Sequence, residues 1–228
     1  MPVYHGTGVQ ECESFSSATE VTKSELTVLR RQAHGGYTTS LLLSTARTYF
    51  VTKYPSRSQP DPINIHVQFI SSVPIGPARL TVDEISLARR YSVIQITLQS
   101  QQPKSGTQQT CIIAIVMQGN LATESGQTIP TPPLVPRSVI PDRETGCEKW
   151  VPPEWLARLL PVGGKMTTFL PKGGTNMRFP SRKGLNLKEV WMKWTDEKER
   201  LDLISLGSVC DQVSMTDVDE LPNKAPWK

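Results

Sequence analysis

The chain has 228 residues, enough for one large or two small domains with a buried core. Its content of 37% hydrophobic and 20% charged residues is typical of an ordinary globular protein. The net charge is +4, and the basic residues are scattered or paired, which argues against nucleic-acid binding. No stretch reaches the roughly 18 apolar residues of a membrane span, and the N-terminus lacks a signal-peptide pattern, so we expect a cytoplasmic protein.

A long helix is predicted directly after a glycine pair. His34-Gly35-Gly36-Tyr37 is followed by the stretch 38–54, which contains no glycine or proline before Pro55. The stretch repeats apolar residues every three to four positions, as a helix with one buried face requires, at Leu42, Ala46, Tyr49 and Phe50. The two glycines would leave the first backbone N–H groups of this helix uncovered, so that a ligand oxygen can approach them closely.

Four strands are predicted after the helix. Residues 63–70 alternate apolar and polar side chains, and residues 78–87 and 92–99 show a similar alternation. Residues 111–117 form an almost continuous apolar run, which is typical of a central strand covered on both faces. One helix followed by four antiparallel strands predicts an α+β domain, to which we assign residues 1–126.

The second half of the chain is less complete. Residues 127–164 are rich in proline and predict an extended linker, because proline cannot donate to a strand ladder. Strands are predicted at 165–170 and 185–194 and a helix at 202–213, and we assign residues 165–228 to a partial second domain. Two strands with one helix are marginal alone, so this part either leans on the first domain or lacks the sequence that completes it.

The motifs that would indicate a cofactor or a metal are missing from the sequence. The four cysteines and three histidines have no ligand spacing, so we expect no metal site, and we expect no cofactor because neither nucleotide-binding glycine pattern occurs. The sequence also argues against a serine hydrolase, since no Gly-x-Ser-x-Gly elbow is present. Cys111 and Cys210 lie in apolar stretches and are predicted to be buried thiols.

The order of these pieces resembles the fungal thioesterase-like proteins of the acyl-CoA thioesterase II group, which carry two hotdog domains in tandem. The likeness covers residues 34–126 and, more loosely, residues 165–213. It is carried by His34-Gly35-Gly36-Tyr37, His66-Val67-Gln68-Phe69-Ile70, Gly76-Pro77-Ala78, Ala88-Arg89-Arg90-Tyr91-Ser92, Thr123-Glu124-Ser125-Gly126 and the run from Leu203 to Asp211.

The resemblance implies a hotdog fold, in which an antiparallel sheet wraps a long helix, and an acyl thioester such as acyl-CoA as substrate. The substrate-binding residues would be His34, Gly35, Gly36 and Tyr37, with the amides of Gly36 and Tyr37 polarising the thioester carbonyl. Asp211 matches a catalytic aspartate that orients water. Because it lies on an apolar helix, we expect burial to raise the pKa of Asp211.

Each of these residues also has an ordinary structural interpretation. The glycine pair could serve only to let helix and sheet pack closely. An isolated histidine such as His34 is more often a surface or hydrogen-bonded residue, and His66 falls on the polar face of its strand. Asp211 could be an exposed carboxylate at the end of a helix.

The chain departs from the group in two respects. It lacks the strands that would bring a hydroxyl residue and a glutamine to the site, and it shows no clear strand before the glycine pair. It is therefore either a shortened form or a relative that has lost hydrolysis and kept the fold.

The leading prediction is a protein that hydrolyses or binds a fatty-acyl or polyketide thioester, with fungal secondary metabolism as a setting by resemblance only. The alternatives are a non-catalytic hotdog protein that binds an acyl group or a partner, and a polyketide dehydratase or cyclase. A homo-oligomer joined through sheet edges is also expected. By analogy with the family, the peroxisome is the alternative to the cytoplasm. The sequence at the end of the chain, Ala225-Pro226-Trp227-Lys228, is not a peroxisomal signal.

Overall fold

The computed structural model describes residues 16–20, 28–29, 32–74, 77–101, 106–127, 142–151, 154, 165–172 and 190–212. These residues group into two compact units. One unit contains the described residues between 2 and 124 and between 202 and 228, and the other contains those between 125 and 201. The segment predicted as a second domain is therefore divided between the units, and the domain boundaries at 126 and 164 stay a prediction.

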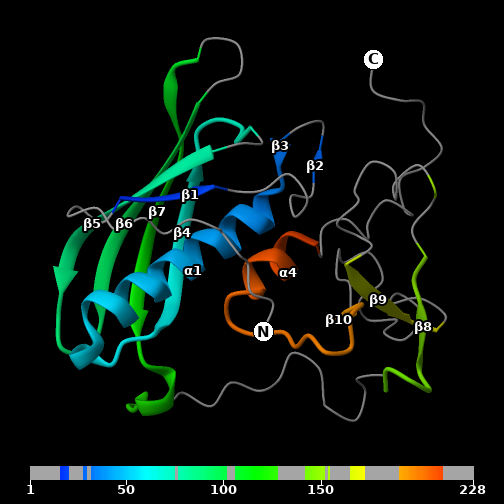
Figure 1. Cartoon of the computed structure of the whole chain (residues 1–228). Helices are drawn as coiled ribbons and strands as arrows, with labels where there is room; N and C mark the ends of the chain where they lie inside the picture. Colours follow the sequence, from blue (N-terminus) through cyan, green and yellow to red (C-terminus); the bar gives the residue numbers. More distant parts are fainter. Residues whose placement is uncertain are drawn as a thin grey trace. The chain divides into compact units, whose positions relative to one another are not determined.

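In the larger unit, a 19-residue helix lies on a five-stranded antiparallel sheet (Figure 1). The strand order in the sheet is β1-β5-β6-β7-β4, and every pair of neighbours is antiparallel. This is the α+β hotdog architecture that the resemblance implies. The elements are α1 (Gly35–Lys53), β1 (Ser16–Glu20), β4 (Asp61–Phe69), β5 (Pro77–Leu87), β6 (Ser92–Gln101) and β7 (Gln108–Gly119).

Short elements complete this unit. A two-stranded hairpin precedes α1, a 3-10 turn follows it, and a second 3-10 turn follows β7. The seven-residue helix α4 belongs to the same unit although it comes late in the chain. The bounds are β2 (Val28–Leu29), β3 (Gln32–Ala33), η1 (Pro55–Arg57), η2 (Leu121–Thr123) and α4 (Leu206–Gln212).

The core of this unit lies between α1 and the sheet. The four apolar positions predicted for the buried face of the helix are all buried, from Leu42 at 0% exposed to Tyr49 at 2%. The inward positions of β6 and β7 alternate along each strand, as the pleat requires, and are filled by Ile94, Ile96, Leu98, Ile112, Ala114 and Val116. Each large side chain buried in this way stabilises the fold by about 1.5–3 kcal/mol before the entropy of ordering is subtracted.

Three local features differ from the predictions. The glycine pair forms the first turn of α1, with His34 as the residue before the helix, so it does not precede the helix as a separate turn. Strand β1 was not predicted and pairs with β5 at the edge of the sheet. Cys210 is exposed, so its prediction as a buried thiol is wrong, whereas Cys111 is buried as expected.

The smaller unit contains a three-stranded antiparallel sheet in the order β10-β9-β8. Its strands are β8 (Cys147–Lys149), β9 (Met166–Pro171) and β10 (Trp191–Trp194). Residues 185–189 of the predicted strand 185–194 lie outside the described residues. The residues described in this unit thus form a partial second sheet, with three strands against the five of the larger unit.

No helix among the described residues is long and apolar enough to cross a membrane.

Candidate functional site

Helix α4 is held in place by the turn that precedes it. The backbone N–H of Ser205 donates to Asp202 Oδ1 at 2.8 Å, and the backbone N–H of Asp202 donates to Ser205 Oγ at 2.7 Å. This reciprocal pair satisfies amides that a short helix would otherwise leave exposed at its start. A seven-residue helix therefore forms here, and it carries Asp211 in its last turn.

Helices α1 and α4 approach each other through small residues. A Cβ atom added to Gly36 would lie 2.9 Å from the Cα of Ser208, and one added to Gly207 would lie 2.8 Å from the backbone nitrogen of Ser40. Both distances are shorter than real contacts of a Cβ atom, so any larger residue at 36 or 207 would push the helices apart. The two glycines are therefore needed for the close contact.

Hydroxyl groups join the two helices at the same contact. Ser40 donates from Oγ to the carbonyl of Ile204 at 2.9 Å and accepts from the backbone N–H of Ser208 at 3.0 Å. Ser208 in turn donates from Oγ to the carbonyl of Gly36 at 3.3 Å. These groups are buried, and each bond replaces one that water would otherwise make. They keep the end of α4 in register with the start of α1.

Asp211 lies against the first turn of α1. Its Oδ2 accepts a hydrogen bond from the backbone N–H of Gly36 at 2.6 Å and lies 3.0 Å from Nδ1 of His34. The side chain of His34 is only 4% exposed, whereas that of Asp211 is 40% exposed. An ionised carboxylate can only accept, so Nδ1 of His34 carries the hydrogen. One buried donor and one backbone donor thus fix the position of a carboxylate that reaches solvent.

These contacts lower the pKa of Asp211. The hydrogen bond from His34 is the largest cause, and the charge of His34 and the Gly36 amide act in the same direction, against partial burial, which raises the pKa. The expectation that burial would raise the pKa of Asp211 is wrong, because hydrogen bonds to the charged form outweigh desolvation. Asp211 is therefore ionised throughout the ordinary pH range.

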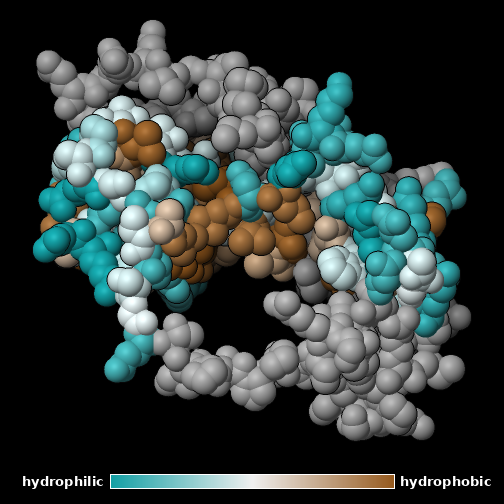
Figure 2. Space-filling view, turned by 90° about the horizontal axis from the view of Figure 1, so that it is seen from below, coloured by the Kyte–Doolittle hydropathy of each residue, from teal (hydrophilic) through white to brown (hydrophobic). Residues whose placement is uncertain are grey.

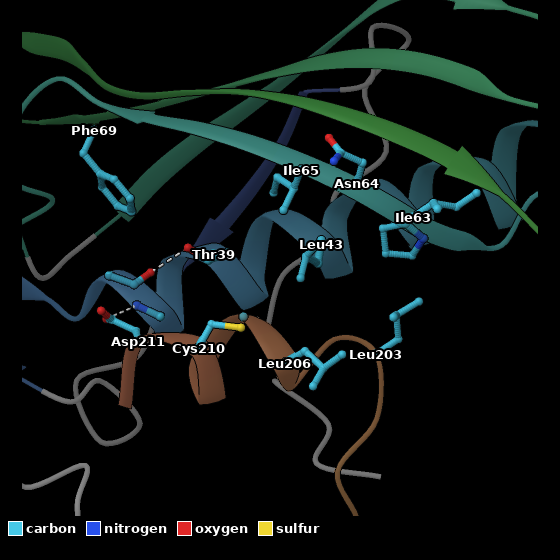
Figure 3. A pocket seen from close by; sticks show the side chains of 14 residues that line it. Thr39, Leu43, Ile63, Asn64, Ile65, Phe69, Leu203, Leu206, Cys210 and Asp211 are labelled. Carbon is cyan, nitrogen blue, oxygen red and sulfur yellow. Dashed lines mark hydrogen bonds between the residues drawn. The ribbon is translucent and has the colours of Figure 1, made fainter. Parts of the chain in front are cut away.

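A cavity of about 430 Å³ begins at this carboxylate and is bounded by α1, β4 and α4. Asp211 lies at one end of it (Figure 3), and Gly35 and Gly36 belong to the lining. Figure 3 shows Ile65 and Phe69 reaching down from β4, with Leu203 and Leu206 on the α4 side, while Asn64 points away. Most of the lining surface is apolar, and Figure 2 shows apolar side chains gathered on the face seen from below. A charged group at the end of an apolar cavity is a common plan of ligand sites.

The structure brings together four of the five residues proposed for the site. His34, Gly35, Gly36 and Asp211 surround one corner, although 175 positions separate Gly36 from Asp211. The amide of Gly36 donates to Asp211 in this structure. Tyr37 is partly buried in the first turn of α1, and its role stays a prediction.

Other residues at this corner were not found from the sequence. Thr39 and Cys210 line the cavity, and Ser40 and Ser208 hold the helices together. Their only sequence signal is spacing, since Gly36 and Ser40 are four residues apart and so are Gly207 and Asp211. The sequence predicts a strand at Phe69 and carries no signal that its ring lines the cavity.

Comparisons with known proteins point to one family for part of the chain. Residues 24–119 match the family model of the acyl-CoA thioesterase N-terminal domain. The thioesterase-like protein TwmA of Talaromyces wortmannii is 29% identical over 105 residues, which is 43% of this chain and 29% of that protein. The chain thus covers less than a third of that relative.

Solved structures share the fold. A proposed thioesterase II from Thermobifida fusca superposes with a TM-score of 0.60 at 14% identity, covering 90% of this chain and 69% of the other. A hotdog protein from Alicyclobacillus acidocaldarius gives a TM-score of 0.55 at 17% identity and covers 89% of this chain and 66% of the other. The resemblance drawn from the sequence is confirmed: residues 24–119 match the acyl-CoA thioesterase N-terminal domain family, and the larger unit has the hotdog fold.

Proposed function

We propose that this chain binds an acyl thioester at the corner formed by α1 and Asp211 and hydrolyses it with water. The observation that carries the proposal is the position of Asp211. Its carboxylate is fixed by His34 and the Gly36 amide, and it lies at the end of an apolar cavity beside the start of a helix.

In the proposed reaction, a water molecule hydrogen-bonded to Asp211 attacks the carbonyl carbon. Its oxygen forms the new C–O bond while the carboxylate accepts the proton. The resulting tetrahedral intermediate collapses, the C–S bond breaks, and the proton passes from Asp211 to the leaving thiolate. The products are a carboxylic acid and a thiol, and Asp211 returns to its ionised form.

Charge that develops on the thioester oxygen is stabilised by the positive end of the α1 dipole, which faces the same corner. In the structure, the Gly36 amide donates to Asp211, so its first contribution is to hold the carboxylate. The lowered pKa of Asp211 keeps the carboxylate in the ionised form, which orients the water and accepts its proton. His34 and Gly36 are positioning groups.

The comparisons support the proposed substrate class by analogy. The matched domain is that of acyl-CoA thioesterases, and the relative TwmA is a thioesterase-like protein. A fatty-acyl or polyketide thioester, in a fungal secondary-metabolic setting, is the substrate we propose. We also propose assembly through sheet edges, one of which is β4.

The test is the substitution Asp211→Asn, which keeps the shape of the side chain and removes its charge. We expect thiol release from a panel of acyl-CoAs to fall by about 10²–10⁴-fold, the usual contribution of a general base, with ligand binding retained. Asp83→Asn, on the exposed part of β5, is the matched control. Unchanged turnover in Asp211→Asn, or no turnover by the unaltered chain, would contradict the proposal.

A second candidate function is supported by the contact between His34 and Asp211. Dehydratases of the hotdog class would usually pair a histidine with an aspartate, and the structure places these two groups 3.0 Å apart. A β-hydroxyacyl thioester separates the candidates, because a dehydratase releases water and leaves the thioester bond intact. Formation of an enoyl thioester that His34→Ala abolishes would favour the dehydratase, and thiol release would favour the hydrolase.

The third candidate is a binding protein without turnover. It is favoured by the hydrogen bond from the Gly36 amide to Asp211, because an amide that donates to this carboxylate does not polarise a thioester carbonyl. Saturable binding of an acyl-CoA, with no chemical change over hours at high protein concentration, would establish it.

A further inference from the structure

The corner at Asp211 leaves open which group donates to the thioester oxygen. The amide of Gly36 donates to the Asp211 carboxylate, and Tyr37 is not among the described residues that line the cavity. The dipole of α1 favours negative charge but supplies no directed hydrogen bond, and acyl transfer relies on donors aimed at the oxygen that becomes charged. Hydrolysis at this corner therefore requires a further donor.

Thr39 is the one residue with a side-chain hydroxyl among the described residues that line this cavity. It lies four residues after Gly35, so both face the cavity from the same side of α1, about 6 Å apart along the helix axis (Figure 3). The other polar side chains of the described lining are those of Asn64, which points away, Cys210, whose thiol is a weak donor, and Asp211. Thr39 is thus the strongest side-chain donor that the described lining offers to a ligand.

The hydroxyl of Thr39 can turn to a ligand because the bond that it makes in the structure is redundant. Thr39 Oγ1 donates to the carbonyl oxygen of Gly35 at 2.9 Å, and Thr38 Oγ1 donates to the same oxygen at 2.7 Å. Helix geometry adds the backbone N–H of Thr39 as a third donor to this oxygen. A carbonyl oxygen has two lone pairs, so Gly35 stays satisfied when the Thr39 hydrogen rotates about the Cβ–Oγ1 bond. This rotation moves no heavy atom.

Asp211 and Thr39 bind opposite ends of one peptide unit. The N–H of Gly36 donates to Asp211, and the C=O of Gly35 accepts from Thr39. These two groups belong to the same peptide bond, and in a trans peptide they point in opposite directions. The carboxylate and the hydroxyl therefore lie apart but line the same cavity, so that a bent row of one water molecule and one carbonyl group can connect them. The water then meets the base, and the carbonyl oxygen meets the hydroxyl.

We propose that Thr39 is a catalytic residue of this site and donates its hydroxyl hydrogen to the thioester oxygen. As water bonds to the carbonyl carbon, an electron pair of the C=O bond moves onto the oxygen, and Thr39 stabilises this charge while it keeps its own hydrogen. When the intermediate collapses, the C=O bond forms again, the C–S bond breaks, and the leaving thiolate takes the proton from Asp211. The inference rests on the proposed function for the reaction, but a hydrogen bond to a bound carbonyl does not require turnover.

The kinetic test is Thr39→Val in the full chain, which removes the hydroxyl and keeps the branched shape of the side chain. We expect kcat for thiol release from an acyl-CoA to fall by about 10²–10³-fold, the usual effect of losing one donor to an oxyanion, with KM nearly unchanged. Thr39→Ser retains a hydroxyl and should recover most of the lost rate. Thr45→Val is the matched control, because Thr45 donates to the carbonyl of Leu41, four residues earlier, at 2.8 Å and does not line this cavity.

A second measurement does not depend on turnover. The probe is an acyl-CoA in which a methylene group replaces the sulfur atom, so that its isotopically labelled carbonyl is a ketone that water cannot cleave. A hydrogen bond to this oxygen weakens the C=O bond, so the infrared band of the bound probe should lie at a lower frequency in the unaltered chain than in Thr39→Val. Thr39→Ser and Thr45→Val should give the band of the unaltered chain. Asp211→Asn should keep this band although it no longer hydrolyses acyl-CoA.

Two results would overturn the proposal: an infrared band that is the same in Thr39→Val and in the unaltered chain, or a kcat that Thr39→Val and Thr45→Val lower equally. Neither result bears on the role of Asp211, which Asp211→Asn tests separately. If no thiol is released from any acyl-CoA but the band still depends on Thr39, hydrolysis is excluded, and the hydrogen bond from Thr39 to the bound carbonyl is supported.

Discussion

Each end of α1 is fixed by a carboxylate, but the groups that donate to the two carboxylates differ. At each end, two or more donors converge on one carboxylate oxygen. At the start, Oδ2 of Asp211 receives the Gly36 amide and His34. At the end, Oε1 of Glu84 receives the Lys53 ammonium at 2.7 Å and the hydroxyls of two tyrosines, Tyr49 and Tyr54.

The difference lies in what surrounds each carboxylate. Around Asp211 the residues are small, so a backbone amide reaches the carboxylate directly and space remains for the cavity. Around Glu84 the donors are long side chains whose rings pack on one another, with Tyr49 and Tyr54 centroids 6.1 Å apart. A carboxylate clamped by large side chains joins helix to sheet, whereas one held by small residues can also face a ligand.

The first prediction concerns the close contact at the start of α1. In Gly36→Ala, the new Cβ would lie 2.7 Å from Cβ of Asp211 and 2.9 Å from the Ser208 backbone, so the helices must move apart. We expect a loss of about 1–3 kcal/mol in the free energy of unfolding, measured with urea. Activity should fall as well, because Asp211 loses its position.

Thr48→Ala, on the exposed side of the same helix, is the control and should be neutral or slightly stabilising. If Gly36→Ala is as stable as the unaltered chain, the start of α1 is not close-packed, and the contrast between the two ends of the helix is lost.

The second prediction concerns the clamp at the other end. Tyr49 is 2% exposed and donates its hydroxyl to Glu84. Tyr49→Phe should lower the free energy of unfolding by about 1 kcal/mol, the usual net value of one hydrogen bond, with no effect on ligand binding. The hydroxyl of Tyr54 donates to the same oxygen at the surface, so Tyr54→Phe should lower the free energy of unfolding by a smaller amount. Equal effects of the two substitutions would contradict the burial argument.

The third prediction is the pH dependence of the clamp. The hydrogen bonds from Lys53, Tyr49 and Tyr54 lower the pKa of Glu84 to about 2, below the value of about 4.3 expected in the unfolded chain. The carboxylate therefore stabilises the fold above pH ~4.3, and this stabilisation is lost as the pH falls toward ~2. The free energy of unfolding, measured between pH ~2 and pH ~4.3, should depend less on pH in Glu84→Gln than in the unaltered chain. A profile identical to that of the unaltered chain would show that Glu84 is not clamped.

The fourth prediction returns to Asp211. The hydrogen bond from His34 lowers the pKa of Asp211, so His34→Ala should raise it. If Asp211 must be ionised for activity, the acid limb of the pH–rate profile then moves to higher pH. His66→Ala, at an exposed histidine on β4, is the control and should leave the profile in place. A profile unmoved by His34→Ala would mean that His34 does not position Asp211.

Much of the fold could be predicted because its signals are local. The spacing of Leu42, Ala46 and Tyr49 along α1, and the alternation along β4 and β6, repeat over several turns or residue pairs. Strand β1 has only five residues and forms by pairing with β5, some 60 positions away in the sequence. No local pattern therefore predicts it.

The site could be predicted only in part. Resemblance pointed to Asp211 and the glycine pair, but the pKa of Asp211 depends on His34, which lies far from it in the sequence. The exposure of Cys210 depends on which side of a seven-residue helix meets α1, and so short a helix has too few apolar positions to decide this.

The contact of the two helices is reciprocal in its glycines and unequal in its polar groups. Gly36 and Ser40 stand four residues apart on α1, as Gly207 and Asp211 do on α4, and each glycine meets the other helix's fourth residue. At one of these two meeting points the polar group is a hydroxyl, and at the other it is an ionisable acid. The contact therefore carries its charge on one side only, and that side is the one that faces the cavity.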